Sequence, residues 1–254
     1  MLLNLSLEKD FRVWLDFLNE IRSIGVDDDF GIPQIAVIGD QSSGKSSLLS
    51  SLSGIPFPRG SGLVTRMPII ITLQTKSRDR TTSDQDEWEA ETSVVLNSNR
   101  DKSGVNEVGI DSEYPGSGRV YSPDALAQNL SKLMQLLTKN SKNGFSSDTI
   151  LVKVSSFNVP NLILVDLPGI VRTTTVGQSI NVISEIDEIL NSFMRQPRTI
   201  ILAVIPANQD IATVDVLERA QRFDPKGMRT IGVITKVDLV ESTAEGEVSG
   251  VFIW

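Results

Sequence analysis

The feature that most constrains the fold is a glycine-rich loop directly after a short apolar run. The run is Ile35-Ala36-Val37-Ile38, and the loop Gly39-Asp40-Gln41-Ser42-Ser43-Gly44-Lys45-Ser46-Ser47 fits the pattern G-x-x-x-x-G-K-[ST]. Four continuous apolar residues are typical of a strand covered on both faces, and the pattern over 45–52 predicts a helix. Strand, loop and helix in this order predict a P-loop α/β fold rather than an ordinary glycine turn.

The rest of the chain repeats this alternation. Further apolar runs predict strands at 68–73, 149–154, 161–166, 199–205 and 230–235. Helical patterns lie at 124–137, 180–193 and 214–221, the first of them with Ser122 as a cap and Pro123 in its first turn. Strands alternating with helices predict a mostly parallel central sheet with helices on both faces.

Two regions fall outside this pattern. Residues 8–24 place Phe11, Trp14, Leu15, Leu18 and Ile21 three or four apart, which predicts one amphipathic helix ending near Gly25. We therefore expect two units: an N-terminal helix of a bundle-type element over 1–29 and the α/β domain over 30–254. The polar stretch 76–118 is interpreted as a mobile surface insertion, with one strand at Ser93-Val94-Val95-Leu96.

Composition removes several kinds of chemistry. The 254 residues include no cysteine and no histidine, which excludes disulfides, thiolate or histidine metal sites and Ser-His-Asp catalysis. A net charge of −8 argues against a broad nucleic-acid surface. The N-terminus has no basic lead, and no apolar run approaches the roughly 18 residues of a membrane span. We expect a soluble, cytoplasmic protein.

The glycine-rich loop implies a phosphate site with a metal beside it. Its glycines let backbone N–H groups turn toward phosphates, Lys45 can neutralise them, and the Ser46 hydroxyl can ligate Mg²⁺. Asp166 ends a predicted buried strand in Val165-Asp166-Leu167-Pro168-Gly169-Ile170, where a carboxylate can hold Mg²⁺ and the Gly169 N–H can meet the terminal phosphate. Alone, this motif could be a simple turn.

A third motif predicts base recognition. Thr235-Lys236-Val237-Asp238 follows a predicted strand, and Asp238 can accept two hydrogen bonds from guanine that adenine cannot donate. The Lys236 stem can lie over the base. The candidate nucleotide-binding residues are Gly39, Asp40, Gln41, Ser42, Ser43, Gly44, Lys45, Ser46, Ser47, Asp166, Leu167, Pro168, Gly169, Thr235, Lys236 and Asp238.

Together with "PFPRGSGLVTRMPI" (56–69) and "ANQDIAT" (207–213), these motifs resemble the G domain of the dynamin superfamily of large GTPases, and Asp40 and "DIAT" resemble its Mx branch. Ile170 stands where many small GTPases carry a water-orienting glutamine, and an isoleucine cannot hold a water. The resemblance implies a different catalytic set: Gln41, Ser42, Lys45 and Thr65, with Thr65 also on Mg²⁺. It further implies a K⁺ or Na⁺ ion held by Ser42 and the carbonyls of Gly60 and Gly62.

The resemblance also implies partners. Two G domains of this family meet across their nucleotide faces, where Asp210 reaches toward the partner's Gln41, and this contact stimulates GTP hydrolysis. The stretch after Val240 departs from the family pattern, so we expect a C-terminally truncated G domain. A membrane, microtubule or other filament partner would then act only through regions missing from this chain. Two alternatives stay open: an assembly-incompetent nucleotide-binding or interaction module, and an ATPase.

Overall fold

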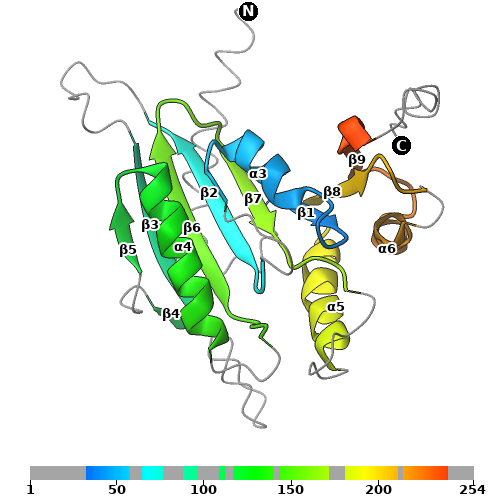
Figure 1. Ribbon diagram of the computed structural model, residues 1–254, viewed down its shortest axis with the longest axis horizontal. Helices are drawn as coiled ribbons and strands as arrows, with labels where there is room; N and C mark the ends of the chain where they lie inside the picture. The colour runs from blue at the N-terminus through cyan, green and yellow to red at the C-terminus, as the bar shows by residue number, and fades with distance from the viewer. Residues whose placement is uncertain are drawn as a thin grey trace, which may run out of the picture.

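The fold is built on one nine-stranded sheet, seen in the computed structural model of Figure 1. The structure describes residues 33–57, 65–76, 88–96, 109–111, 117–139, 144–171, 181–210 and 214–239. The strands are β1 (Gln34–Gly39), β2 (Ile69–Thr75), β3 (Trp88–Leu96), β4 (Gly109–Asp111), β5 (Gly118–Val120), β6 (Thr149–Ser156), β7 (Leu162–Asp166), β8 (Thr199–Pro206) and β9 (Thr230–Thr235). The helices are α3 (Lys45–Ser53), α4 (Pro123–Thr138), α5 (Asn181–Met194) and α6 (Asp215–Phe223), and a 3-10 turn, η3 (Val237–Leu239), follows β9.

The strand order is β4-β3-β6-β2-β7-β1-β8-β9, with β5 paired to β3. The predicted α/β sheet is confirmed, but it is mixed: β7, β1, β8 and β9 are parallel to one another, whereas β2 runs antiparallel to β7 and β3 antiparallel to β6. Only five residues join β6 to β7, too few for a parallel crossover, so β7 reverses direction. Apolar runs identify strands without giving their direction, and this is why the sequence overstated the parallel content.

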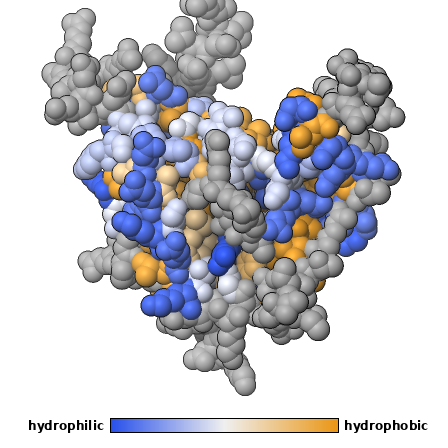
Figure 2. All heavy atoms as spheres, viewed as in Figure 1, coloured by the Kyte–Doolittle hydropathy of each residue, from blue (hydrophilic) through white to orange (hydrophobic). Residues whose placement is uncertain are grey.

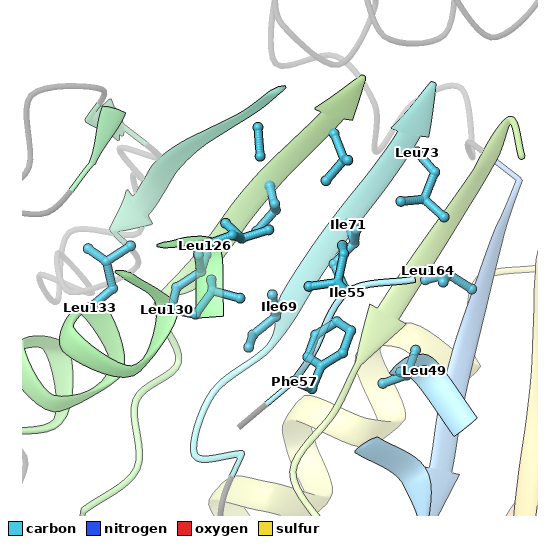
Figure 3. Packing of buried hydrophobic residues seen from close by; sticks show 14 of the residues in the cluster. Leu49, Ile55, Phe57, Ile69, Ile71, Leu73, Leu126, Leu130, Leu133 and Leu164 are labelled. Atoms are coloured by element: carbon cyan, nitrogen blue, oxygen red, sulfur yellow. The ribbon is translucent and has the colours of Figure 1, made fainter. Parts of the chain in front are cut away.

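Helices cover both faces of the sheet, as predicted. Alternate residues of β1 and β8 face opposite sides, so Val37 and Leu202 belong to one core and Ala36 and Ile201 to the other. The first core packs against α3 and α4, and Figure 3 shows Phe57, Leu126 and Leu130 near β2 and β6, with Leu49 of α3 on the side of β7. The second core packs against α5 and α6.

One prediction needs correction. The region 76–118 contains a full nine-residue strand, β3, which includes the expected strand at 93–96, and the short strand β4, while β5 begins at its last residue. Residues Ala90, Thr92 and Val94 alternate into the core beneath α4, with Ala90 and Val94 fully buried. Glu89 and Glu91 occupy the intervening positions, so the first half of β3 alternates between polar and buried residues. A search for continuous apolar runs therefore does not identify it.

The predicted helix boundaries hold within one or two residues. Ser122 caps α4 by accepting a hydrogen bond from the Ala125 amide at 3.2 Å. None of the helices in the described ranges is long and apolar enough to cross a membrane. The predicted helix over 8–24, the loop with Gly60 and Gly62, and the stretch from Val240 onward lie outside the described residues.

Candidate nucleotide-binding site

The glycine-rich loop lies between the end of β1 and the start of α3. Lys45 is buried there, and its Nζ donates to the carbonyl oxygens of Gly39 at 3.0 Å and Asp40 at 2.8 Å. Gly44 has a φ of 103°, a left-handed conformation that glycine adopts without strain. Ser42 also has a positive φ, 61°, which costs a residue with a Cβ roughly 1 kcal/mol or more. The loop is therefore wrapped around its own lysine.

The third motif contacts this loop directly. The Thr235 hydroxyl, at the end of β9, donates to the carbonyl oxygen of Ser43. A Cβ added to Gly44 would lie 3.2 Å from the Thr235 side chain, so the missing side chain at Gly44 allows this close approach. Sequence analysis placed both motifs at one site but gave no signal for the hydrogen bond between them.

Asp166 and Thr65 meet beside the loop. Asp166 ends β7 and is 1% exposed, and its Oδ2 accepts a hydrogen bond of 2.8 Å from the Thr65 hydroxyl. Thr65 reaches it because β2 pairs antiparallel with β7, with Ile69 opposite Asp166. The antiparallel strand that the sequence did not predict thus brings Thr65 to the end of β7.

Burial controls the charge of this site. Burial raises the pKa of Asp166 to about 6, although the Thr65 hydrogen bond and the Lys45 charge act in the opposite direction. Burial also lowers the pKa of Lys45, against the attraction of Asp166 and Asp40. Both ionised groups are therefore held at an energetic cost that a polyvalent ligand could offset.

The donor set suits a magnesium ion. The second carboxylate oxygen of Asp166, Oδ1, is buried without a hydrogen-bond partner among the described residues. Oxygen ligands are those that Mg²⁺ prefers, and it usually takes only one or two from protein, with phosphate and water supplying the others. The described ranges hold no group of three or more acidic residues placed to bind a metal ion, and a magnesium site of this kind does not need one. Asp166 and Thr65 fit as its residues, and Ser46 stays a prediction from the sequence.

Gly169 and Ile170 connect this carboxylate to the loop. The Ile170 amide donates to the Gly39 carbonyl oxygen at 3.1 Å, and its side chain is 3% exposed in the second core. Ile170 therefore cannot orient a water, as its side-chain chemistry indicated. A Cβ on Gly169 would lie 3.0 Å from the Cα of Gln41 and 3.2 Å from Lys45 Nζ.

We predict that Gly169→Ala destabilises the fold. Backbone of the loop cannot move aside cheaply, so the substitution should lower the free energy of unfolding by about 1–3 kcal/mol. Gly232→Ala is the matched control because a Cβ at Gly232 meets no atom within 4 Å. Urea unfolding monitored by circular dichroism measures both, and equal effects at the two glycines would contradict the close approach.

The base motif lies at the surface of the same edge. Lys236, Val237 and Asp238 are exposed, and Lys236 has a φ of 56°. The amide of Ala207 donates to the Thr235 carbonyl oxygen at 2.7 Å, which fixes the start of this turn beside β8.

The start of β9 is held by a network that the sequence did not reveal. Asp224 accepts from the amides of Met228 and Arg229 and from the Thr230 hydroxyl, at 2.7 to 3.0 Å. Arg229 in turn donates to the carbonyl oxygens of Met194, Thr199 and Phe223. These bonds fix β9 against α5, α6 and β8, and thereby place Thr235.

Of the remaining predicted nucleotide-binding residues, Ser43, Leu167 and Pro168 are buried, Ser46 is half-buried and Ser47 is exposed. Gln41, Ser42 and Asp210 are exposed on the described surface. Gly60 and Gly62 lie outside the described residues, so the predicted cation loop has no structural description.

Comparison with known proteins identifies the family of this chain. The sequence model of the dynamin family matches residues 35–237. Interferon-induced GTP-binding protein Mx1 of Bos taurus is 39% identical over 95% of this chain, MxA of Danio rerio 38% over 95%, and Mx1 of Mus musculus 38% over 95%. The chain spans 33–34% of the length of these relatives. The predicted resemblance to the Mx branch is thus confirmed.

The matched range starts in β1 and ends at Val237, so it contains the glycine-rich loop, the Thr65–Asp166 pair and the base motif except Asp238. It covers about four fifths of the chain. The chain belongs to the dynamin family.

Proposed function

We propose that this chain binds Mg²⁺·GTP and hydrolyses it to GDP and phosphate. The observation that carries the proposal is the convergence of Lys45, Thr65 and Asp166 at the end of the parallel strands, where open α/β sheets bind ligands. The names of the relatives, which are GTP-binding proteins, support guanine as the base.

Each residue has a proposed role. Lys45 leaves the loop carbonyls to neutralise the β- and γ-phosphates, and the loop amides between Gly39 and Ser46 surround them. Asp166, Thr65 and Ser46 would hold Mg²⁺, which when bound neutralises phosphate oxygens. Asp238 reads the guanine edge, while Lys236 covers the base.

The catalytic assignments rest on the family resemblance. Thr65 orients the attacking water through its carbonyl oxygen, and Gln41 and Ser42 complete the set. Ser42, Gly60 and Gly62 would hold a K⁺ or Na⁺ ion, whose charge stabilises the transition state. A cytoplasmic location and the two-unit division at residue 29 stay predictions from the sequence.

Multiple-turnover phosphate release from the purified full chain tests hydrolysis. We expect release from GTP with Mg²⁺ and K⁺, little release from ATP, and no release after Lys45→Ala. Release that persists after Lys45→Ala would come from a contaminant and would count against the proposal.

The competing function is a weak nucleotide-binding or interaction module without turnover. Val237 and Leu239, 58% and 53% exposed, flank the exposed Asp238, and a base motif this open to water favours weak binding of the base. Saturable GTP binding with no phosphate release above that of Lys45→Ala would favour this second function.

We also propose that two copies associate through the nucleotide face, since Gln41 and Asp210 are both exposed. We predict that the GTP turnover rate per molecule rises with protein concentration, and that Asp210→Lys weakens this rise. Phosphate release across a hundredfold concentration series measures it. A rate per molecule that stays flat in the unmodified chain would remove the dimer from the proposal.

We predict a pH dependence of the metal-assisted binding step. Asp166 can hold Mg²⁺ only as a carboxylate, and burial raises its pKa to about 6. The Mg²⁺-dependent gain in nucleotide affinity should be constant above about pH 7 and fall roughly tenfold per pH unit well below pH 6. Titrations with and without Mg²⁺ isolate this gain, and a gain that is unchanged at about pH 5 would contradict the role of Asp166.

A further inference from the structure

A turn between α4 and β6 lies against the segment that carries Thr65. The Ser146 amide donates to the Arg66 carbonyl oxygen at 3.1 Å. This bond lies beyond the last paired residues of β2 and β6, on the side toward Thr65. We name residues 144–148 the α4–β6 turn. Its backbone is thus joined to the chain at the residue that follows a proposed magnesium ligand.

A serine hydroxyl and a buried carboxylate close the α4–β6 turn. A second bond, from the Ile150 amide to the Pro68 carbonyl oxygen at 3.1 Å, lies two residues further along one segment but four further along the other, so the turn inserts extra residues. Ser146 Oγ spans them: it donates to Asp148 Oδ2 at 2.7 Å and accepts from the Asp148 amide at 3.1 Å. Asp148 is 8% exposed. These two side chains therefore set the shape of the turn.

The turn is also anchored in the core. Phe145 is 5% exposed and belongs to the second core, which also contains Leu167 and Ile170 of the Asp166 motif. A buried aromatic side chain gives the turn a fixed base, because moving it would expose a large apolar surface to water. The turn can therefore act as a rigid support for the Arg66 carbonyl group.

The strand pairing alone does not fix Thr65. In the described part of the chain, the pairing of β2 with β7 ends at Ile69, which lies opposite Asp166. Thr65 comes four residues before Ile69, yet its hydroxyl donates to Asp166 at 2.8 Å. The residues between them must therefore keep one course beyond the strand end. The bond from Ser146 to Arg66 fixes that course beside Thr65.

We propose that Ser146 and Asp148 are positioning residues for Thr65. The turn that they close holds the Arg66 carbonyl oxygen and thereby keeps the Thr65 hydroxyl beside Asp166. This inference rests on the proposed hydrolysis of Mg²⁺·GTP, in which Thr65 holds the metal and orients the water. Neither positioning residue touches the nucleotide in that scheme. Opening the turn should therefore slow turnover much more than it weakens binding of GDP without Mg²⁺.

Turnover and binding by the purified full chain test this role. Ser146→Ala removes the hydroxyl, whereas Ser146→Thr keeps it. We expect Ser146→Ala to lower kcat for GTP about tenfold or more, while the Kd for GDP without Mg²⁺ stays within about twofold of that of the unmodified chain. Ser146→Thr should recover most of the lost kcat. Asp148→Ala should lower kcat by a similar factor, and the double alanine variant should lose no more than either single variant, because both break one turn.

Ser131→Ala is the matched control. The Ser131 hydroxyl donates to the Ala127 carbonyl oxygen at 2.9 Å within α4, the helix whose outer side is mostly hydrophilic in Figure 2. Both substitutions delete a serine hydroxyl, but Ser131 takes part in no bond of the α4–β6 turn described above. Ser131→Ala should leave kcat within about twofold of that of the unmodified chain.

Trypsin cleavage after Arg66 tests the positioning without turnover. Arg66 is exposed and lies in the segment that the turn holds. In the nucleotide-free chain, Ser146→Ala should speed this cleavage about fivefold or more, whereas cleavage after Arg195, between α5 and β8, should keep its rate.

Two results would overturn the inference: Ser146→Ala that changes neither kcat nor cleavage after Arg66, and equal effects of Ser146→Ala and Ser146→Thr. An unmodified chain without turnover would instead contradict the proposed function. Cleavage after Arg66 would then decide by itself whether the turn holds the Thr65 segment.

Discussion

Lys45→Ala is expected to weaken binding of Mg²⁺·GTP by roughly a hundredfold or more and to abolish measurable turnover. The reason is that the substitution removes a positive charge that the loop holds in place for the reacting phosphate. Lys45 is the one lysine that β1 and α3 enclose in the loop, where its Nζ already lies against the carbonyl oxygens of Gly39 and Asp40. No other described cation takes part in these loop contacts.

The fold should tolerate this change, which separates function from stability. Burial lowers the pKa of Lys45, so its ammonium is held at a cost in the absence of phosphate. Removing it should leave the free energy of unfolding unchanged or slightly higher. Lys153→Ala, an exposed lysine on β6, is the control and should leave affinity intact. Isothermal titration with GTP and urea unfolding of both variants measure the two effects.

Asp166→Asn is expected to stabilise the metal-free protein while it removes Mg²⁺-dependent nucleotide binding. Burial raises the pKa of Asp166 from 3.8 to about 6. A carboxyl group whose pKa is higher in the folded than in the unfolded state stabilises the fold at pH values below its unfolded-state pKa. This stabilisation is lost as the pH rises through its folded-state pKa. Above about pH 6 the ionised carboxylate therefore costs the fold about 3 kcal/mol, which is the scale of the expected gain. Asparagine keeps an oxygen acceptor for the Thr65 hydroxyl.

Asp224→Asn provides a control with the opposite sign. Burial alone would raise the pKa of Asp224. The hydrogen bonds that it accepts from the Arg229 amide, the Thr230 hydroxyl and the Met228 amide outweigh this effect and lower the pKa. A carboxyl group whose pKa is lower in the folded than in the unfolded state stabilises the fold at pH values above its unfolded-state pKa. This stabilisation is lost as the pH falls through its folded-state pKa. Asn at 224 should therefore destabilise the fold at neutral pH. Urea unfolding without Mg²⁺ decides both, and a loss of stability in Asp166→Asn would contradict the account of the buried carboxylate.

Much of the site follows from local sequence because its parts are turns at strand ends. The glycine-rich loop, the Asp166 motif and the Thr235 motif each sit directly after an apolar run, and parallel strands bring such ends together. Thr65 was placed by family resemblance alone. Its contact with Asp166 depends on the antiparallel pairing of β2 with β7, which no local pattern encodes.

The remaining features depend on long-range packing. The Thr235–Ser43 hydrogen bond joins residues 192 positions apart, and the Arg229 contacts draw together the ends of α5, α6 and β8. β3 was underestimated because glutamates fill the positions facing away from α4. In each case the residues are visible in the sequence, but their partners are set by the tertiary fold.

The central claim is that the loop, Thr65 and Asp166 form one Mg²⁺·GTP site. Equilibrium titration of the purified full chain with a fluorescent GTP analogue tests it most directly. The account predicts that the analogue binds saturably and that Mg²⁺ strengthens this binding. Excess unlabelled GTP should displace the analogue, whereas the same concentration of ATP should not. Binding that is absent, indifferent to Mg²⁺ or displaced equally by ATP would contradict it.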